Sequence, residues 1–506
     1  MHSSLLDALK PFPALILQAR RHTGDTEELV GKARFPANSA RFFTSGRGAP
    51  PAYNRVMAPL HPAPAPRVRP VQETVLQNGL KVLVQETRTA PLVSVWCWYK
   101  VGSKDEAPGR TGASHWVEHM NFKGTRNIPR DEMKAIVERF GGTWNGYTWI
   151  DQTAYFETAP PEALDRMLFI EAERMANGLY DPAECESERT VVIAELQGGD
   201  NDPEQLLETE VTAAAFRAHP YGHPTIGWLP DLQSMTRDEL YGHYRRYYIP
   251  NNATLVIVGD VDAAEAVRLA DRRFGAIPAA EAPPRCGTIE PPQMGERRVR
   301  IDRPGSAAYL KIAYPAPAFA DPDFCPLLVL DAVLTGAKGV NLWSSYRNPP
   351  QRRARLYRAL VDRQIAASVY GSMLPTEQPF LYIVSVAAND GVPLELVEEA
   401  TLRELDLVRT RGITSAELDR ARHQLRARLV FDADSVTNIA HQLGYFETIA
   451  DLERYDSLWR SIAAVTLDDV SRAAGRLSAS HRTVGWFQPA AAAEADLPLA
   501  AGAEGA

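Results

Sequence analysis

The sequence has few cysteines and no long hydrophobic run, and each absence argues against a class of protein. Four cysteines occur among the 506 residues, and no two of them form a C-x-x-C pair. This scarcity argues against a disulfide framework and against a zinc ribbon. We interpret them as ordinary buried thiols: Cys97, Cys185, Cys286 and Cys325. No apolar run approaches about 18 residues, so the sequence predicts no membrane-spanning helix.

The N-terminal region is not expected to be a secretory signal. Its apolar segment Ala14–Leu17 is too short and too closely interrupted by Pro and Arg. Prolines from Pro59 to Pro70 predict a stiff, extended lead-in, so we expect residues 1–70 to be a poorly ordered extension. The expected localisation is cytoplasmic, and the alternative is an organelle matrix reached through an N-terminal presequence. A further alternative is that translation begins at Met57.

Charge is distributed unevenly along the chain. The sequence holds 55 Lys+Arg and 63 Asp+Glu, of which the first 70 residues hold 10 and 4. The remainder therefore has 45 basic against 59 acidic residues, a net charge of −14. An acidic body argues against nucleic acid as a partner and is compatible with basic peptide substrates. The length alone predicts about three or four domains.

Histidine is scarce as well, with 11 in the chain, yet His115, Glu118 and His119 fit the pattern H-x-x-E-H. On a helix these three positions lie on one face, so their side chains can converge. Two imidazoles suit zinc, and the carboxylate is placed to take a proton from water. The alternative is a polar helix face, a chance match expected in roughly one chain in fifty. The sequence therefore predicts a zinc helix over about Ser114–Phe122, with Ser114 as its N-cap.

A second helix carries candidate carboxylates. The segment Glu184–Glu195 is helical by pattern, and Glu188 and Glu195 lie seven residues apart on one face. Alone, this pattern is typical of a solvated helix. A catalytic zinc site needs a third protein ligand, however, and a carboxylate is an accepted choice. The H-x-x-E-H residues therefore make this helix a candidate source of that ligand.

Other patterns predict strands and helices around these two segments. Asn78-Gly79 between two alternating runs is a strong hairpin signal. The expected strands are Glu73–Leu76, Leu80–Gln85, Val93–Val101, two within Thr143–Phe156, and Thr254–Val258. The expected helices are Asp131–Phe140 and Pro161–Asn177.

The second part of the sequence repeats the pattern of the first. Capping boxes begin at Thr236 and Thr466, and each is followed by a helix and then a strand. A strand at Ala307–Tyr314 matches Val93–Val101. The sequence therefore predicts an α+β fold of two homologous halves that face each other across a chamber. The expected parts are a catalytic half with the zinc site (71–276), a Pro-rich linker (277–292), a second half that binds no metal and encloses substrate (293–488), and a disordered tail (489–506).

In combination, several segments resemble the pitrilysin/insulinase zinc metallopeptidases, in particular their processing-peptidase-like subgroup of short chains. The resemblance covers about residues 71–488. It rests on HWVEHMNFKGT (115–125), GGTWNGYTWIDQTAYF (141–156), ERTVVIAE (188–195), HPYGHPTIG (219–227), YIPNNATLVIVGDVD (248–262) and RLYRALVDRQIAASV (355–369).

The resemblance implies a role for each site residue. It implies that one zinc ion per chain is bound by His115, His119 and Glu195, with Glu118 as general base. Glu188 matches an acidic position that orients a ligand histidine. The implied activity is that of a zinc-dependent endopeptidase, which hydrolyses peptides or short unfolded segments inside a chamber.

A further segment matches the family's substrate-binding strand. Asn145, Gly146, Tyr147 and Thr148 match its N-A-x-T segment, beside an edge strand on which a peptide adds. Gly146 replaces the usual alanine, which leaves the backbone role intact and is expected to add local freedom.

The same family uses an Arg and a Tyr from a second-half domain to hold substrate and stabilise the oxyanion. The nearest positions here are Val361 and Ala367, whose side chains donate no hydrogen bond. Arg363 and Tyr370 lie close in sequence and are alternative donors. We therefore expect a heterodimer with a zinc-less paralogous chain that carries the Arg/Tyr pair, with a homodimer as the alternative.

Two non-enzymatic functions are alternatives to the peptidase. One is a catalytic-looking subunit that acts as a structural component of a larger assembly, but such relatives typically lose the zinc ligands. The other is a peptide-binding clamp with a structural zinc, but such sites usually have four protein ligands. Retention of the whole residue set favours the peptidase.

Overall fold

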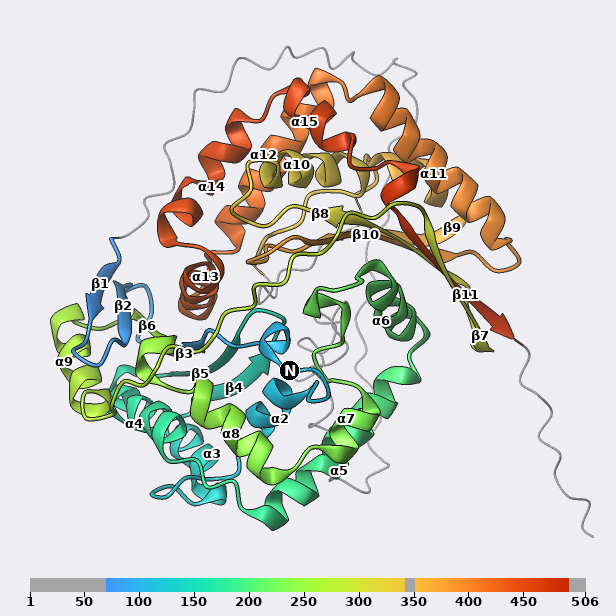
Figure 1. Cartoon of the computed structure of the whole chain (residues 1–506). Helices are drawn as coiled ribbons and strands as arrows, with labels where there is room; N and C mark the ends of the chain where they lie inside the picture. The colour runs from blue at the N-terminus through green and yellow to red at the C-terminus, as the bar shows by residue number, and fades with distance from the viewer. Residues whose placement is uncertain (1–69, 342–350, 491–506) are drawn as a thin grey trace, which may run out of the picture. The chain divides into compact units, whose positions relative to one another are not determined.

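The computed structural model describes residues 70–341 and 351–490, which belong to one compact unit (Figure 1). Most of the predicted extension and tail therefore lie outside the described residues. Pro489 and Ala490, assigned to the tail, instead extend the last strand, β11 (Thr483–Ala490). Among the described residues, every helix is too short or too polar to span a lipid bilayer.

The first half contains a six-stranded sheet with the strand order β1-β2-β6-β3-β5-β4. Strands β2 and β6 are parallel, and the other neighbours are antiparallel. The strands are β1 Gln72–Val75, β2 Lys81–Glu86, β3 Val93–Tyr99, β4 Thr143–Thr148, β5 Thr153–Ala159 and β6 Ala253–Gly259. The helices are α2 Ala113–Met120, α3 Arg130–Glu138, α4 Leu164–Ala176, α5 Pro182–Asp200, α6 Pro203–Ala215, α7 Leu229–Ser234, α8 Arg237–Tyr247 and α9 Ala263–Phe274.

The second half contains a five-stranded sheet with the order β7-β11-β8-β10-β9. Strands β7 and β11 are parallel, and the other neighbours are antiparallel. Its remaining strands are β7 Arg297–Pro304, β8 Tyr309–Ala316, β9 Ala366–Met373 and β10 Phe380–Ala388. Its helices are α10 Phe324–Leu334, the π-helical turn η6 Tyr357–Val361, α11 Leu394–Arg411, α12 Ser415–Phe431, α13 Val436–Ile449, α14 Leu452–Ala464 and α15 Leu467–Ala474.

The two sheets confirm the predicted duplication. The second sheet repeats the order and directions of the first, with β7, β11, β8, β10 and β9 equivalent to β2, β6, β3, β5 and β4. Among the described strands, only β1 has no counterpart. Thr236 and Thr466 form complete capping boxes at the starts of α8 and α15. These helices precede β6 and β11, the equivalent strands of the two sheets. The fold is therefore α+β and consists of two homologous halves.

Each half contributes a helix to the sheet of the other half, an arrangement the sequence did not predict. Helix α13 packs on β3 and β6, where Trp96 and Trp98 of β3 join one hydrophobic core with residues of the second half. Helix α6 packs on β7, β8 and β11, and its Leu207 and Val211 join Phe487 in another core. Figure 1 shows α13 beside the first sheet and α6 beside the second. The exchange covers apolar faces of both sheets.

At Gly444, helix α13 packs closely against Trp98 of the first sheet, so a larger side chain at this position is expected to lower stability. A Cβ atom at this position would lie 1.9 Å from Trp98 Nε1, and Trp98 is fully buried. We expect Gly444→Ala to lower the free energy of unfolding by about 1–3 kcal/mol, although alanine normally stabilises a helix. The midpoint of urea unfolding measures the change.

Gly242 in α8 provides the matched control, because nothing lies within 4 Å of the position of its Cβ atom. Gly242→Ala should leave the midpoint unchanged or raise it, since alanine has the higher helix propensity. Equal midpoints for the two variants would contradict the close packing of α13 on the sheet.

Candidate metal centre

Helix α2 is held at its N-terminus by the carboxylate of Glu106, which lies six residues before the N-cap. The N-cap is Gly112, with a φ of 88°, so the prediction of Ser114 as N-cap is wrong. The Glu106 carboxylate accepts hydrogen bonds from the main-chain N–H groups of Gly112 at 2.8 Å and Ser114 at 2.7 Å. The Ser114 hydroxyl instead donates to the carbonyl of Gly102. An acidic group at this end also suits the helix dipole.

The three predicted ligands lie together. Nε2 of His119 is 3.5 Å from Oε2 of Glu195, and Nε2 of His115 is 3.9 Å from the same oxygen. Ligands of a tetrahedral zinc lie roughly 3.3–3.5 Å apart, given metal–ligand distances of about 2.0–2.1 Å. Two imidazole nitrogens and a carboxylate oxygen at this spacing fit zinc. Within residues 70–341 and 351–490, no other group of three or more His, Cys, Asp or Glu has such a geometry.

Helix α5 supplies both Glu195 and Glu188, and Glu188 fixes one of the imidazoles. Glu188 is 2% exposed, and its Oε1 lies 2.9 Å from Nδ1 of His119. Its other oxygen forms an ion pair with Lys123. A hydrogen bond at Nδ1 orients the ring and leaves Nε2 directed at the proposed metal position. Glu188 therefore contacts the ring nitrogen of His119 that does not face Glu195.

Glu118 lies on the same face of α2 but is held separately from the three ligands. Its Oε2 accepts a hydrogen bond of 2.8 Å from the Thr148 hydroxyl, and its side chain is buried. Burial raises the pKa of Glu118 above its usual value, and the neighbouring His119 and Thr148 oppose that shift. A carboxyl group with a raised pKa beside a metal site suits a group that accepts and later returns a proton.

The electrostatics around the ligands favour a cation. Burial raises the pKa of Glu195 to about 7, and Glu118 and Glu188 add to the rise while His119 opposes it. Burial holds the pKa of His115 well below its usual value, and His119 lowers it further. Burial alone would lower the pKa of His119, but the Glu188 hydrogen bond and nearby carboxylates raise it. The carboxylates of Glu118, Glu188 and Glu195 lie close together, and a divalent cation would balance their negative charge.

Comparison with known proteins places the chain in a family. Two family models match the chain. The one described as "Insulinase (Peptidase family M16)" matches residues 81–228, and the one described as "Peptidase M16 inactive domain" matches residues 234–425. The zinc protease PqqE of Helicobacter pylori is 30% identical over 414 residues, which cover 80% of this chain and 90% of the relative. The chain belongs to the insulinase family, peptidase family M16. The resemblance found in the sequence is thereby confirmed.

Other relatives agree with this assignment. The mitochondrial-processing peptidase subunit beta of Blastocladiella emersonii is 24% identical, over 82% of this chain and 87% of the relative. Among solved structures, a protease from Helicobacter pylori superposes with a TM-score of 0.77 at 26% identity, covering 83% of this chain and all of the other. A peptidase M16 inactive domain from Pseudomonas fluorescens shares the fold, with a TM-score of 0.74 at 18% identity and coverage of 84% and 98%.

The segment Asn145–Thr148, which the resemblance matched to a substrate-binding strand, lies on β4, the edge strand of the first sheet. Among the described strands, β4 pairs only with β5, so its other edge is available for an added strand. Asn145 is exposed on this strand, and its side-chain oxygen accepts a hydrogen bond from the N–H of Gly146. Tyr147 instead points into the core, where its hydroxyl lies 2.9 Å from Nε2 of His441 on α13. The Thr148 hydroxyl donates to Glu118, so the segment connects the edge of the sheet to this buried carboxylate.

Gly146 allows a close contact rather than local freedom. A Cβ atom there would lie 2.9 Å from the ring of Tyr155 and 3.0 Å from the ring of Phe122. The expectation of added freedom at this position is therefore wrong, because two aromatic rings occupy the space of the usual alanine side chain.

The positions that correspond to the family's Arg and Tyr lie at the far edge of the second sheet. Val361 ends η6, and Ala367 lies exposed on β9. Arg363 is exposed between them. Tyr370, also on β9, is 38% exposed, and the Lys338 ammonium lies 5.0 Å from the centre of its ring. Neither aligned side chain can donate a hydrogen bond to an oxyanion.

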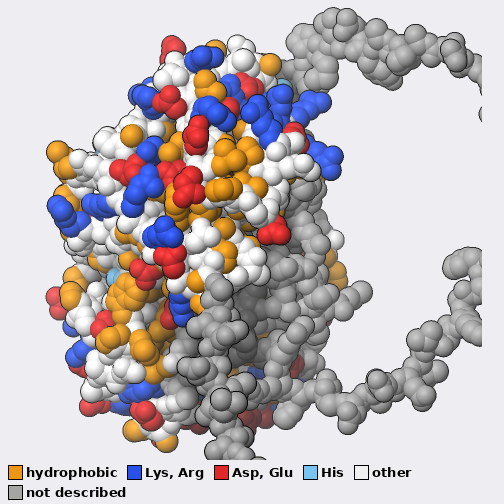
Figure 2. Space-filling view, turned by 90° about the vertical axis from the view of Figure 1, so that its right-hand side faces the viewer, with side chains coloured by type: hydrophobic (Ala, Val, Ile, Leu, Met, Phe, Trp, Pro, Cys, Tyr) orange, Lys and Arg blue, Asp and Glu red, His pale blue; other side chains and the backbone are white. Residues whose placement is uncertain are grey.

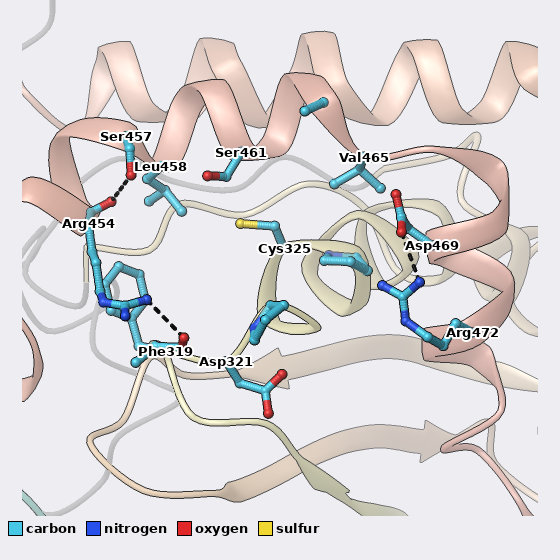
Figure 3. Close-up of a pocket in the computed structure, with 14 residues that line it drawn as sticks. Phe319, Asp321, Cys325, Arg454, Ser457, Leu458, Ser461, Val465, Asp469 and Arg472 are labelled. Atoms are coloured by element: carbon cyan, nitrogen blue, oxygen red, sulfur yellow. Dashed lines mark hydrogen bonds and ion pairs between the residues drawn. The ribbon is translucent and has the colours of Figure 1, made fainter.

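A separate cavity of about 320 Å³ lies in the second half, between α14, α15 and the start of α10 (Figure 3). Arg454 and Arg472 lie at its two ends, with Cys325 between them. Arg454 donates to the carbonyl of Ala320, and Arg472 pairs with Asp469. Both guanidinium groups therefore have partners, and none of the predicted site residues lines this cavity.

Charged side chains of both signs are intermixed on one face of the protein. Figure 2 shows Lys and Arg side chains among Asp and Glu on this face, with hydrophobic side chains between them.

Proposed function

We propose that this chain is the zinc-bearing subunit of an endopeptidase. His115, His119 and Glu195 would bind one zinc ion, and Glu118 would act as the general base. The observation that carries the proposal is the convergence of two Nε2 atoms on Oε2 of Glu195, at 3.5 and 3.9 Å, beside the separately held Glu118. The substrates would be peptides or short unfolded segments, and the acidic body favours basic ones.

The chain's own residues would handle the substrate and the proton. A peptide strand added to β4 would run past Thr148 and bring its scissile bond to Glu118. Glu118 would accept a proton from the attacking water and pass it to the leaving amine. Thr148 keeps that carboxylate in place, and Glu188 keeps the His119 ring in place. Zinc, when bound, supplies the Lewis acid that activates water and polarises the carbonyl.

A partner chain would complete the site. Val361 and Ala367 stand where the family places its oxyanion donors, and neither side chain has a donor. We propose that a zinc-less paralogous chain supplies an Arg/Tyr pair in a heterodimer. Support comes from relatives named as beta subunits of mitochondrial-processing peptidases. A homodimer that uses Arg363 and Tyr370 is the alternative.

A non-catalytic role is the second candidate function. The match of residues 234–425 to a domain described as inactive favours a structural or peptide-binding component of a larger assembly. This candidate predicts peptide binding without hydrolysis, even when the chain is loaded with zinc and mixed with its paralogue. A quenched-fluorescent basic peptide separates the two functions.

The metal assignment predicts about one zinc per purified chain, measured by elemental analysis. His119→Ala should lose most of it, because only two protein ligands, His115 and Glu195, would remain. The control is His423→Ala on α12, an exposed histidine outside the cluster, which should retain the metal. Full zinc content in His119→Ala would remove this residue from the ligand set.

A further inference from the structure

Lys123 reaches the centre from the turn that follows α2. Helix α2 ends at Met120, and the main-chain N–H of Lys123 donates to the carbonyl of Met120 at 2.9 Å. This turn brings the Lys123 ammonium back to Oε2 of Glu188 on α5. The other oxygen of Glu188 lies 2.9 Å from Nδ1 of His119. One carboxylate is thus held by two groups, one at each oxygen.

Because the Glu188 carboxylate is buried, its negative charge needs a positively charged partner. Glu188 is 2% exposed, and the Lys123 side chain is 16% exposed. A buried carboxylate without a positive partner is strongly destabilised. Among the described residues, the ionic contacts of Glu188 are with His119 and Lys123. Because a histidine that ligates a metal is neutral, Lys123 is the group that can balance the charge.

We propose that Lys123 is a positioning residue of the metal centre. Its ammonium holds Glu188 in the rotamer that fixes the His119 ring, so it acts on zinc affinity through Glu188. Lys123 does not contact the ligand atoms themselves. The inference rests on the proposed zinc site and deepens it, since it names the group that keeps the orienting carboxylate in place.

The experiment measures zinc affinity of the full chain by competition with a chelator. Lys123→Met removes the charge and keeps much of the side-chain volume, and it should weaken zinc binding about 10–100-fold. Lys123→Arg keeps the charge and should restore most of the affinity. The matched control is Lys134→Met on α3, an exposed lysine paired with Glu138, which should leave affinity unchanged.

A double variant tests whether Lys123 acts through Glu188. If it does, Lys123→Met combined with Glu188→Gln should bind zinc no more weakly than Glu188→Gln alone. Additive losses would overturn the proposed route. Should Lys123→Met fail to fold, as judged by circular dichroism, Lys123→Gln removes the charge while retaining a polar side chain.

The outcomes separate this inference from the proposed function. Wild-type affinity in the charge-removing variants would overturn the role of Lys123 and leave the zinc site intact. Failure of the wild-type chain to bind zinc would overturn the proposed function itself. A loss that Lys123→Arg restores, together with non-additivity, is the expected result.

Discussion

Glu118→Gln should retain zinc and lose hydrolysis by about 10²–10⁴-fold, because general-base catalysis contributes a factor of that size. The substitution preserves the shape of the side chain and leaves an oxygen that can still accept the hydrogen bond from Thr148. It removes only the ability to accept a proton. Zinc content and single-turnover cleavage of a basic peptide, in the presence of the paralogue, measure the two effects separately.

Glu132→Gln on α3 is the control for this variant. Glu132 pairs with Arg139 on the surface, and its side chain is 46% exposed. Its substitution should change neither zinc content nor rate. Substantial activity in Glu118→Gln would remove Glu118 from the mechanism, and loss of zinc in that variant would instead place it among the ligands.

The pure chain should turn over peptide slowly even when fully loaded with zinc, and a paralogue carrying the Arg/Tyr pair should accelerate it by about 10²–10³-fold. This factor is the typical effect of one preorganised oxyanion donor. It follows from Val361 and Ala367, which lie on η6 and β9 and cannot donate. The measurement compares initial rates for the chain alone, the paralogue alone and the mixture.

Substitutions at Arg363 and Tyr370 distinguish the proposed heterodimer from the alternative homodimer. In a heterodimer that relies on the paralogue's donors, Arg363→Ala and Tyr370→Phe should leave the rate of the mixture nearly unchanged. Fast turnover by the chain alone, abolished by either substitution, would show that this chain supplies its own donors. The proposal of a heterodimer would then be wrong.

The sequence predicted those parts of the fold that short-range patterns encode. Asn78-Gly79 gives the β1–β2 hairpin, and the boxes at Thr236 and Thr466 cap α8 and α15. The spacing of His115, Glu118 and His119 places them on one face of α2 because helical periodicity depends only on the local chain. The repeated pattern predicted two homologous halves, and the structure adds the strand order that the two sheets share.

The features that the sequence did not predict depend on contacts between distant residues. Glu106 is an exception, because it caps α2 from only six residues before Gly112, outside the standard capping motifs. The interior direction of Tyr147 depends on His441, 294 residues further along the chain. The lysine at 123 lies within the family segment HWVEHMNFKGT, but only the fold brings it to Glu188. Long-range packing, rather than propensity, decides such positions.

The exchange of α6 and α13 has a consequence for how this duplicated chain can be inherited. A gene fragment that encoded either half alone would leave a hydrophobic sheet face open to water, with Trp96 and Trp98 in one case and Phe487 in the other. Such faces promote aggregation. The repeat therefore resembles a swapped dimer fused into one polypeptide, and a gene fragment for one half alone would encode an aggregation-prone product.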